Sequence, residues 1–154
     1  MISRRHFLIL GCGVASGVQA QLPANIAEIR RKALQEAVAK VTGNAQVRRG
    51  RVKLEIPPLI DNGNAVPLSV EVESPMTAAD HVKAIHIFTE RNPQPYVLTA
   101  HVGPRAGKAR IATRARIGDT GEVIAIAQMS DGSFWSDGVR VVVTLSACLE
   151  EGLI

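Results

Sequence analysis

The residue of this sequence with the most evident chemistry is a cysteine near its end, in the stretch VVVTLSACLEEGLI. Cys148 follows Leu145, the last residue of a strand-forming run, by three residues. An extended tether of that length reaches about 10 Å, at roughly 3.3–3.6 Å per residue, so it could carry a thiol into another protein's cleft. The thiolate is a nucleophile. A free cysteine can equally be a small buried hydrophobic residue, so the cysteine alone leaves both interpretations open.

The first residues of the chain predict an export signal. Arg4 and Arg5 lie in a Ser-Arg-Arg-His-Phe-Leu stretch that resembles the twin-arginine motif, and Val-Gln-Ala precedes a predicted cleavage site after Ala20. The apolar stretch of residues 7–18 is much shorter than the roughly 20 residues that a membrane span needs, so we expect no membrane anchor. We therefore predict a twin-arginine signal peptide over residues 1–20 and a periplasmic location.

Cleavage would change the cysteine count of the mature protein. The sequence has two cysteines, and Cys12 lies in the leader, too early to fit a lipoprotein signal. After its removal Cys148 is a single thiol in an oxidising compartment. A leftover cysteine in an exported chain indicates a reactive thiol or an intermolecular bond.

The remaining residues offer no metal site. His81 and His86 are five residues apart on one predicted strand, and an odd separation places them on opposite faces. A blue-copper centre needs a thiolate with two imidazoles, usually with an axial methionine. In the usual arrangement a histidine and a methionine follow the cysteine, but His101, Met129 and every other such residue precede Cys148. We expect no cofactor.

Catalytic and nucleic-acid-binding patterns are also missing from the sequence. There is no Gly-x-Ser-x-Gly nucleophile elbow, and Glu71 and Glu73 fit the solvated face of a half-buried strand. The formal net charge of +4 includes Arg4 and Arg5 of the leader, and the other cations are too dispersed for a nucleic-acid face. The chain is thus not predicted to be an enzyme or a nucleic-acid-binding protein.

The hydrophobic pattern predicts the elements that position the cysteine. Residues 21–44 have helical spacing, and the predicted apolar stripe comprises Ile26, Ile29, Ala33, Leu34, Ala37, Val38 and Val41. Arg30, Arg31, Lys32, Glu36 and Lys40 are expected on its solvated face. From residue 45 to 145 the period changes to two, with about seven strands and a turn signal roughly every ten residues. This predicts an all-β fold, an immunoglobulin-like antiparallel β-sandwich with an N-terminal helix. Residues 146–154 form the predicted C-terminal arm.

Several segments in one order resemble the SoxY family of sulfur carriers from the bacterial Sox thiosulfate-oxidising system. They are DNGNAVPLSVEVESPM, VKAIHIFTERNPQPYV, ARIATRARIGD, VIAIAQMSDGSFWSDG and VRVVVTL, followed by the terminal cysteine. The resemblance implies an immunoglobulin-like sandwich paired with a SoxZ-like sandwich subunit. It also implies that a haem-containing enzyme joins thiosulfate to the carrier cysteine and that a hydrolytic enzyme removes sulfate. By position, Cys148 matches that cysteine.

The ending of the chain departs from the family pattern. The family's usual Gly-Gly-Cys-Gly-Gly is replaced here by Ser-Ala-Cys-Leu-Glu-Glu. Side chains narrow the backbone angles that glycine allows, and Glu150 and Glu151 should repel an anionic substrate. We predict a periplasmic sulfur carrier of thiosulfate oxidation with Cys148 as the attachment point. The alternative is a noncatalytic exported binding or scaffold module whose cysteine is structural or interfacial.

Overall fold

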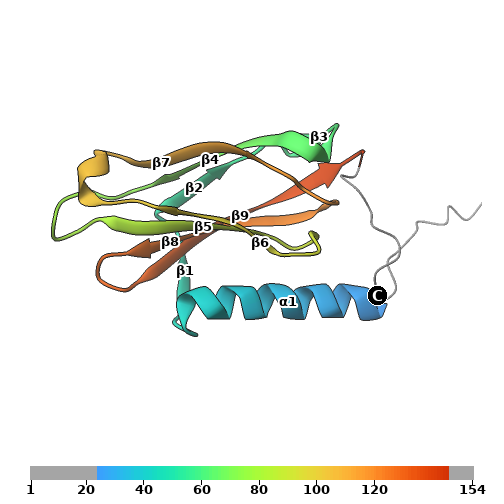
Figure 1. The fold of residues 1–154 in the computed structure, drawn as a ribbon, viewed down its shortest axis with the longest axis horizontal. Coiled ribbons are helices and arrows are strands. Elements are labelled where there is room, and N and C mark those ends of the chain that lie inside the picture. The colour runs from blue at the N-terminus through green and yellow to red at the C-terminus, as the bar shows by residue number, and fades with distance from the viewer. Residues whose placement is uncertain (1–23, 146–154) are drawn as a thin grey trace, which may run out of the picture.

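Residues 24–145 form a two-layer β-sandwich with one helix packed on its outside, as described by a computed structural model (Figure 1). The predicted leader with Arg4 and Arg5, and the predicted arm with Cys148, lie outside these described residues. The described part therefore shows the body of the protein and the point from which the arm extends.

The described residues contain one α-helix, nine strands and two short 3-10 turns. The helix is α1 (Ala24–Thr42), and the 3-10 turns are η1 (Gly63–Ala65) and η2 (Pro104–Ala106). The strands are β1 (Val47–Arg49), β2 (Val52–Glu55), β3 (Leu59–Ile60), β4 (Val66–Val72), β5 (Val82–Thr89), β6 (Tyr96–His101), β7 (Ala109–Ala115), β8 (Gly121–Met129) and β9 (Phe134–Val143).

The strands form two sheets of unequal size. The larger sheet has the order β1-β9-β8-β5-β6 with β3 also paired to β9, and the smaller sheet has the order β2-β4-β7. The prediction of a β-sandwich with an N-terminal helix is confirmed. The prediction of about seven strands did not include β1 and β3, two short strands that pair with β9 in parallel. They have three and two residues, too few for an alternating pattern to show.

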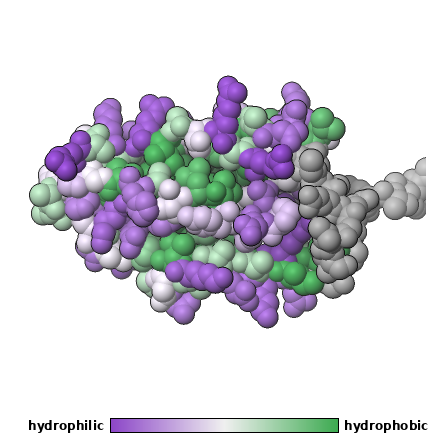
Figure 2. All heavy atoms as spheres, in the orientation of Figure 1, coloured by the Kyte–Doolittle hydropathy of each residue, from purple (hydrophilic) through white to green (hydrophobic). Residues whose placement is uncertain are grey.

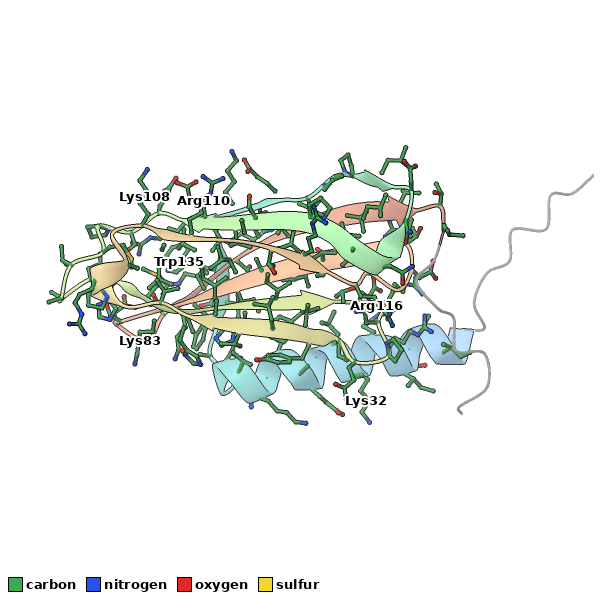
Figure 3. All side chains as sticks on the ribbon, turned by 45° about the horizontal axis from the view of Figure 1, so that its top comes forward. Lys32, Lys83, Lys108, Arg110, Arg116 and Trp135 are labelled. Atoms are coloured by element: carbon green, nitrogen blue, oxygen red, sulfur yellow. The ribbon has the colours of Figure 1, made fainter. Side chains whose placement is uncertain are left out.

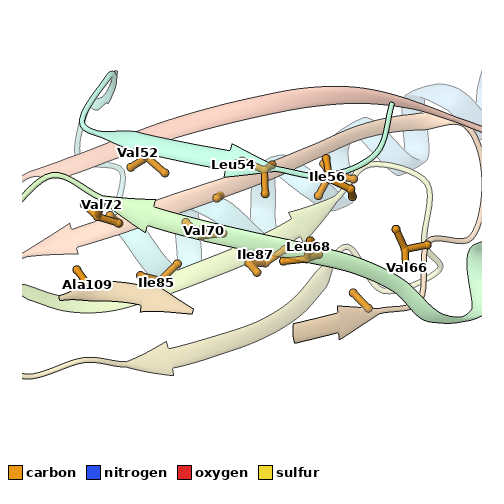
Figure 4. Close-up of a cluster of buried hydrophobic side chains, with 14 of the residues drawn as sticks. Val52, Leu54, Ile56, Val66, Leu68, Val70, Val72, Ile85, Ile87 and Ala109 are labelled. Carbon is orange, nitrogen blue, oxygen red and sulfur yellow. The ribbon is translucent and has the colours of Figure 1, made fainter. Parts of the chain in front are cut away.

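The core lies between the two sheets and is built from aliphatic side chains of alternating strand positions. In β4, Val66, Leu68, Val70 and Val72 are all buried while the intervening residues are not. They face Ile85 and Ile87 of β5, both fully buried (Figure 4). The hydrophobic period of two in the sequence thus corresponds to the side chains that point into the core.

Helix α1 covers the outer face of the larger sheet. Leu34, Ala37, Val38 and Val41 pack against Phe88, Ile126 and Phe134 of the sheet. Strands β5 and β8 are therefore buried on both faces where the helix lies, which explains their nearly continuous apolar sequence. The surface seen in Figure 2 is mostly hydrophilic, with hydrophobic atoms near its middle and at the end where β3 lies.

The buried face of α1 differs from the predicted one at its N-terminal half. Ile29 is 55% exposed, whereas Arg30 is partly buried and its Nη1 atom is fully enclosed. Residue 30 lies four positions before Leu34 and therefore on the same helix face as Leu34 and Val38. This is the face that packs against the larger sheet. No helix within residues 24–145 has the length and apolar character to cross a membrane.

Two glycines of the larger sheet provide a test of this packing. A Cβ at Gly121 would collide with Cγ of Arg91, an atom near the base of the side chain that can move aside only if the whole arginine side chain changes its χ1 rotamer. We expect Gly121→Ala to lower the free energy of unfolding by about 1–3 kcal/mol. Gly138→Ala is the control, because its nearest neighbour is Oε1 of Glu122 at 2.6 Å, the end of a flexible side chain. Urea unfolding measures both, and equal losses would contradict the prediction.

Candidate functional site

The chain leaves the sandwich after β9, and hydrogen bonds to β3 and to η1 hold this exit. The Val142 amide donates to the carbonyl of the residue before β3 at 2.8 Å, and the Thr144 amide donates to the last carbonyl of β3 at 2.9 Å. The Leu145 carbonyl then accepts the Gly63 amide at 3.1 Å. The backbone is therefore fixed up to the third residue before Cys148.

Thr120, in the connection between β7 and β8, holds the same segment from the other side. Its Oγ1 accepts the Val143 amide at 2.9 Å and donates to the Val143 carbonyl at 3.4 Å. The hydroxyl of Thr144 adds bonds to the carbonyls of Ile60 and Asp61, at 3.4 and 3.2 Å. Both backbone and side-chain groups thus stabilise the last residues of the sandwich.

A second tier of hydrogen bonds joins this exit to the neighbouring loops. The Gly63 carbonyl accepts the Ile117 amide at 2.8 Å. The Asn92 side chain brackets Ile117, because its Nδ2 donates to the Arg116 carbonyl at 2.9 Å and its Oδ1 accepts the Gly118 amide at 2.6 Å. Asn92 lies in the connection between β5 and β6, so three loops are tied together at one end of the sandwich.

We call this end the arm end and define it by residues 61–65, 90–95, 116–120 and 144–145. Exposed apolar side chains lie within and beside it: Leu145 within it is 61% exposed, and Leu59 and Val142 beside it are 60% and 47% exposed. Leu59 and Val142 are register partners in the parallel pairing of β3 with β9. The exit of the arm is therefore flanked by a small apolar surface on a rigid base.

Catalytic groups do not converge at the arm end within residues 24–145. Its charged side chains include Glu90 and Arg91, whose ion pair spans 4.0 Å, and Asp61, which is exposed. Across the described residues there is no group of three or more His, Cys, Asp or Glu that could hold a metal ion. What this geometry does is fix the backbone of the last described residues, Thr144 and Leu145.

The histidines that the sequence raised as ligand candidates lie apart. His81 precedes β5 and its Nδ1 lies 3.1 Å from the Thr77 carbonyl. His86 is within β5 on the outer face of the larger sheet, 7% exposed, with Nδ1 2.6 Å from Thr99 Oγ1. His101, the last residue of β6, is exposed.

Burial sets the charge of His86. Desolvation lowers the pKa of His86, and the nearby His101 lowers it further when charged. Its Nε2 is buried and has no hydrogen-bond partner among the described residues. The ring is therefore predominantly neutral at neutral pH.

Glu71 and Glu73 do not form a catalytic pair. Glu71 lies on the outer face of the smaller sheet, with Lys53 and Arg110 as its register partners on either side. Glu73 follows β4, and its backbone carbonyl accepts a hydrogen bond from Arg51 Nε at 3.1 Å. Both carboxylates are exposed, in agreement with the predicted solvated face.

The residues that hold the arm end were not found from the sequence. Gly63, Asn92 and Thr120 each lie in a turn, where polar residues and glycine are common for many reasons. The hydrogen-bond partner of Thr120, Val143, is 23 residues away in the sequence, and Leu145, which binds Gly63, is 82 residues away. The only available signal was that Asn92 and Gly63 stand in strong turn sequences.

Comparison with known families places the chain. The sequence profile of a family described as "Sulfur oxidation protein SoxY" matches residues 38–148, which include the whole sandwich and end at Cys148. The chain belongs to the SoxY family. The predicted resemblance to SoxY is thereby confirmed.

Solved structures agree with this family assignment. The sulfur carrier protein SoxY from Chlorobium limicola f thiosulfatophilum is 26% identical, with 75% of this chain and 99% of that chain covered and a TM-score of 0.63. This match confirms the predicted immunoglobulin-like sandwich.

More distant structures share only the fold with this SoxY-family chain. A superoxide reductase (neelaredoxin) from Ignicoccus hospitalis is 16% identical over 61% of this chain and 80% of that chain, with a TM-score of 0.55. A putative superoxide reductase from Thermotoga maritima is 18% identical over 66% and 89%, with a TM-score of 0.52. Comparison with curated proteins gives no match.

Removing the Thr120 hydroxyl tests the anchoring of the exit. Thr120→Val keeps the shape but removes the acceptor of the Val143 amide, and we expect the free energy of unfolding to fall by about 1 kcal/mol or more. Amide hydrogen exchange at Val143 and Thr144 should accelerate. Thr120→Ser retains the hydroxyl and is the control. Unchanged exchange in Thr120→Val would contradict the anchoring role.

The pKa of His86 predicts a pH dependence. Because this pKa is lower in the folded state, the unfolded chain binds more protons as the pH falls below about 6.5. The contribution of neutral His86 is present above that pH and is lost on acidification. Chemical denaturation should show stability falling from pH 7 to pH 5, with a smaller fall in His86→Gln. An equal fall in both proteins would refute this assignment.

Proposed function

We propose that this chain is a periplasmic sulfur carrier that holds intermediates of thiosulfate oxidation covalently on Cys148. The observation that carries the proposal is the fixed end of the sandwich at Leu145, three residues before a cysteine at which the family match ends. A tether of that length reaches about 10 Å beyond a rigid base. The likeness to the SoxY sulfur carrier of Chlorobium limicola supports the same role.

The loading step is a two-electron oxidation. The Cys148 thiol loses its proton, and its sulfur forms a bond to the outer sulfur of thiosulfate, giving a cysteine S-thiosulfonate. A haem-containing partner enzyme accepts the two electrons. A hydrolytic partner enzyme then uses water to release sulfate, and the remaining sulfane sulfur stays on the cysteine.

In this proposal the chain carries the substrate and its partners perform the chemistry. The arm end has exposed apolar side chains and hydrogen-bonded loops, which suit a surface that visiting enzymes contact. A SoxZ-like subunit is the proposed permanent partner. Export through the twin-arginine pathway, directed by Arg4 and Arg5, would move the folded pair together.

The residues around Cys148 set the conditions for loading. Glu150 and Glu151 place two negative charges next to an anionic substrate, and the lack of flanking glycines restricts the arm. Salt screens such exposed charges, with a Debye length of about 8 Å at physiological ionic strength. Loading should therefore be faster at higher ionic strength than at lower ionic strength.

Intact-mass spectrometry tests the proposal directly. The mature protein, incubated with thiosulfate and the haem-containing enzyme, should gain the mass of one thiosulfate adduct, and Cys148→Ser should gain none. A family member that ends in Gly-Gly-Cys-Gly-Gly is the positive control for the enzyme. If that control is loaded while this chain stays unmodified, the carrier role of Cys148 fails.

Thiol labelling separates a carrier from a scaffold. A thiol presented on an arm should react with a maleimide in the native protein about as fast as in the unfolded protein. Protection until unfolding would favour the scaffold interpretation, in which the cysteine is packed at an interface.

A further inference from the structure

The side of the sandwich formed by β6 and β7 is open. Each sheet ends there, because β6 and β7 each have one edge without a strand partner among residues 24–145. Figure 4 shows Ala109 of β7 on the side of β4 away from Val52 and Leu54 of β2. On that far side β2 contacts β9, whose outer edge is covered by β1 and β3. The β6–β7 side thus presents two free strand edges together, one from each sheet.

The core reaches solvent along this open side. Ile111 of β7 is the register partner of Val70, yet Val70 is fully buried and Ile111 is only partly buried. Leu98 of β6 packs against the same core and is also partly buried. Apolar side chains that a further strand could cover are therefore already in place at this edge.

Positive charge follows β7 along its whole length. Between Glu90 and Asp119 the sequence has no acidic residue. The exposed cations there are Arg105, Lys108, Arg110, Arg114 and Arg116. Figure 3 shows Lys108 and Arg110 near one end of the molecule on the side away from α1, and Arg116 toward the opposite end, closer to α1.

These cations form no ion pair within 4.0 Å among the described residues. The ion pairs there belong to Arg51, Lys53 and Arg91, with distances of 3.8, 2.7 and 4.0 Å. Arg110 faces Glu71 across the ladder without forming an ion pair within 4.0 Å. The edge therefore offers unpaired positive charge beside partly exposed apolar side chains.

A second copy of this chain does not fit the β7 edge. Antiparallel pairing of two β7 strands about Ala112 would place Arg110 opposite Arg114 and Lys108 opposite Arg116, in both halves of the pair. Like charges directly opposite one another destabilise a sheet. The charges protect the edge against self-association, as charged edge strands do in general, and leave it open to a strand of opposite charge.

We propose that the β7 edge binds the partner subunit through an edge strand that carries Asp or Glu at alternating positions, extending the smaller sheet across the interface. The inference rests on the proposed function, which supplies a SoxZ-like subunit as partner. The partner would lie near the arm, because β7 is followed closely by Ile117. The Ile117 amide donates a hydrogen bond to the Gly63 carbonyl, and the Gly63 amide donates one to the Leu145 carbonyl. Its surface would then flank the exit of the tether.

The test measures binding of the purified SoxZ-like subunit to the full mature chain by calorimetry. Arg110→Glu with Arg114→Glu should weaken binding at least tenfold, and raising the salt concentration should weaken the wild-type complex. Arg31→Glu with Lys32→Glu changes the net charge equally on the exposed face of α1 and should leave the affinity unchanged. Thermal melts of both variants check that they fold.

Each outcome decides the inference. Loss of binding in the β7 variant alone supports it, and so does partial recovery in Arg110→Gln with Arg114→Gln. Equal affinity of wild type and β7 variant, equal losses in both charge-reversed variants, or no binding by the wild type would overturn it. Loading of Cys148 with thiosulfate is measured without the SoxZ-like subunit, so failure of the docking surface and failure of the carrier role remain distinguishable.

Discussion

The hydrogen bond between the Leu145 carbonyl and the Gly63 amide is the constraint on which the arm geometry depends. With it, the last fixed residue is Leu145, three positions before Cys148 in the sequence. If the segment from Val142 onward left β3, the last fixed residue would be Val141, seven positions before Cys148. Each such bond contributes only about 0.5–1.5 kcal/mol net, so the position is secured by several acting together, including those of Thr120.

The sequence allowed prediction of the strands whose two faces differ, because their pattern depends on local residue type, while the role of Cys148 stays a prediction. Strand β4 alternates buried and exposed residues throughout, so its pattern records its environment. Strand β3, with two residues, exists only because β9 offers it hydrogen bonds. The hydrophobic pattern also could not predict how α1 is rotated about its axis. Ile29 and Arg30 are adjacent in the helix, and the contact with the sheet determines which of the two side chains is buried. Gly63, Asn92 and Thr120 act through backbone groups distant in sequence, which no local pattern encodes.

The two sides of the sandwich differ in how their strand edges are covered. On one side β9 receives β1 and β3 in parallel and so loses its free edge, while α1 covers the outer face of the larger sheet. The other side has no such cover within residues 24–145, and there the edge strand β7 is lined with cations. At a free edge that carries only positive charges, like-charge repulsion disfavours pairing with a second copy of the same strand. The same charges favour pairing with an acidic strand.

The connection between β7 and β8 links these two features. Residues 116–118 follow the basic strand β7, and the Asn92 side chain forms hydrogen bonds to Arg116 and Gly118. Ile117, between them, donates a hydrogen bond to Gly63, which in turn binds Leu145. The C-terminal end of β7 is therefore connected to Leu145 through two backbone hydrogen bonds, from Ile117 to Gly63 and from Gly63 to Leu145. The last described residues of the chain and the segment that follows β7 thus belong to one hydrogen-bonded unit.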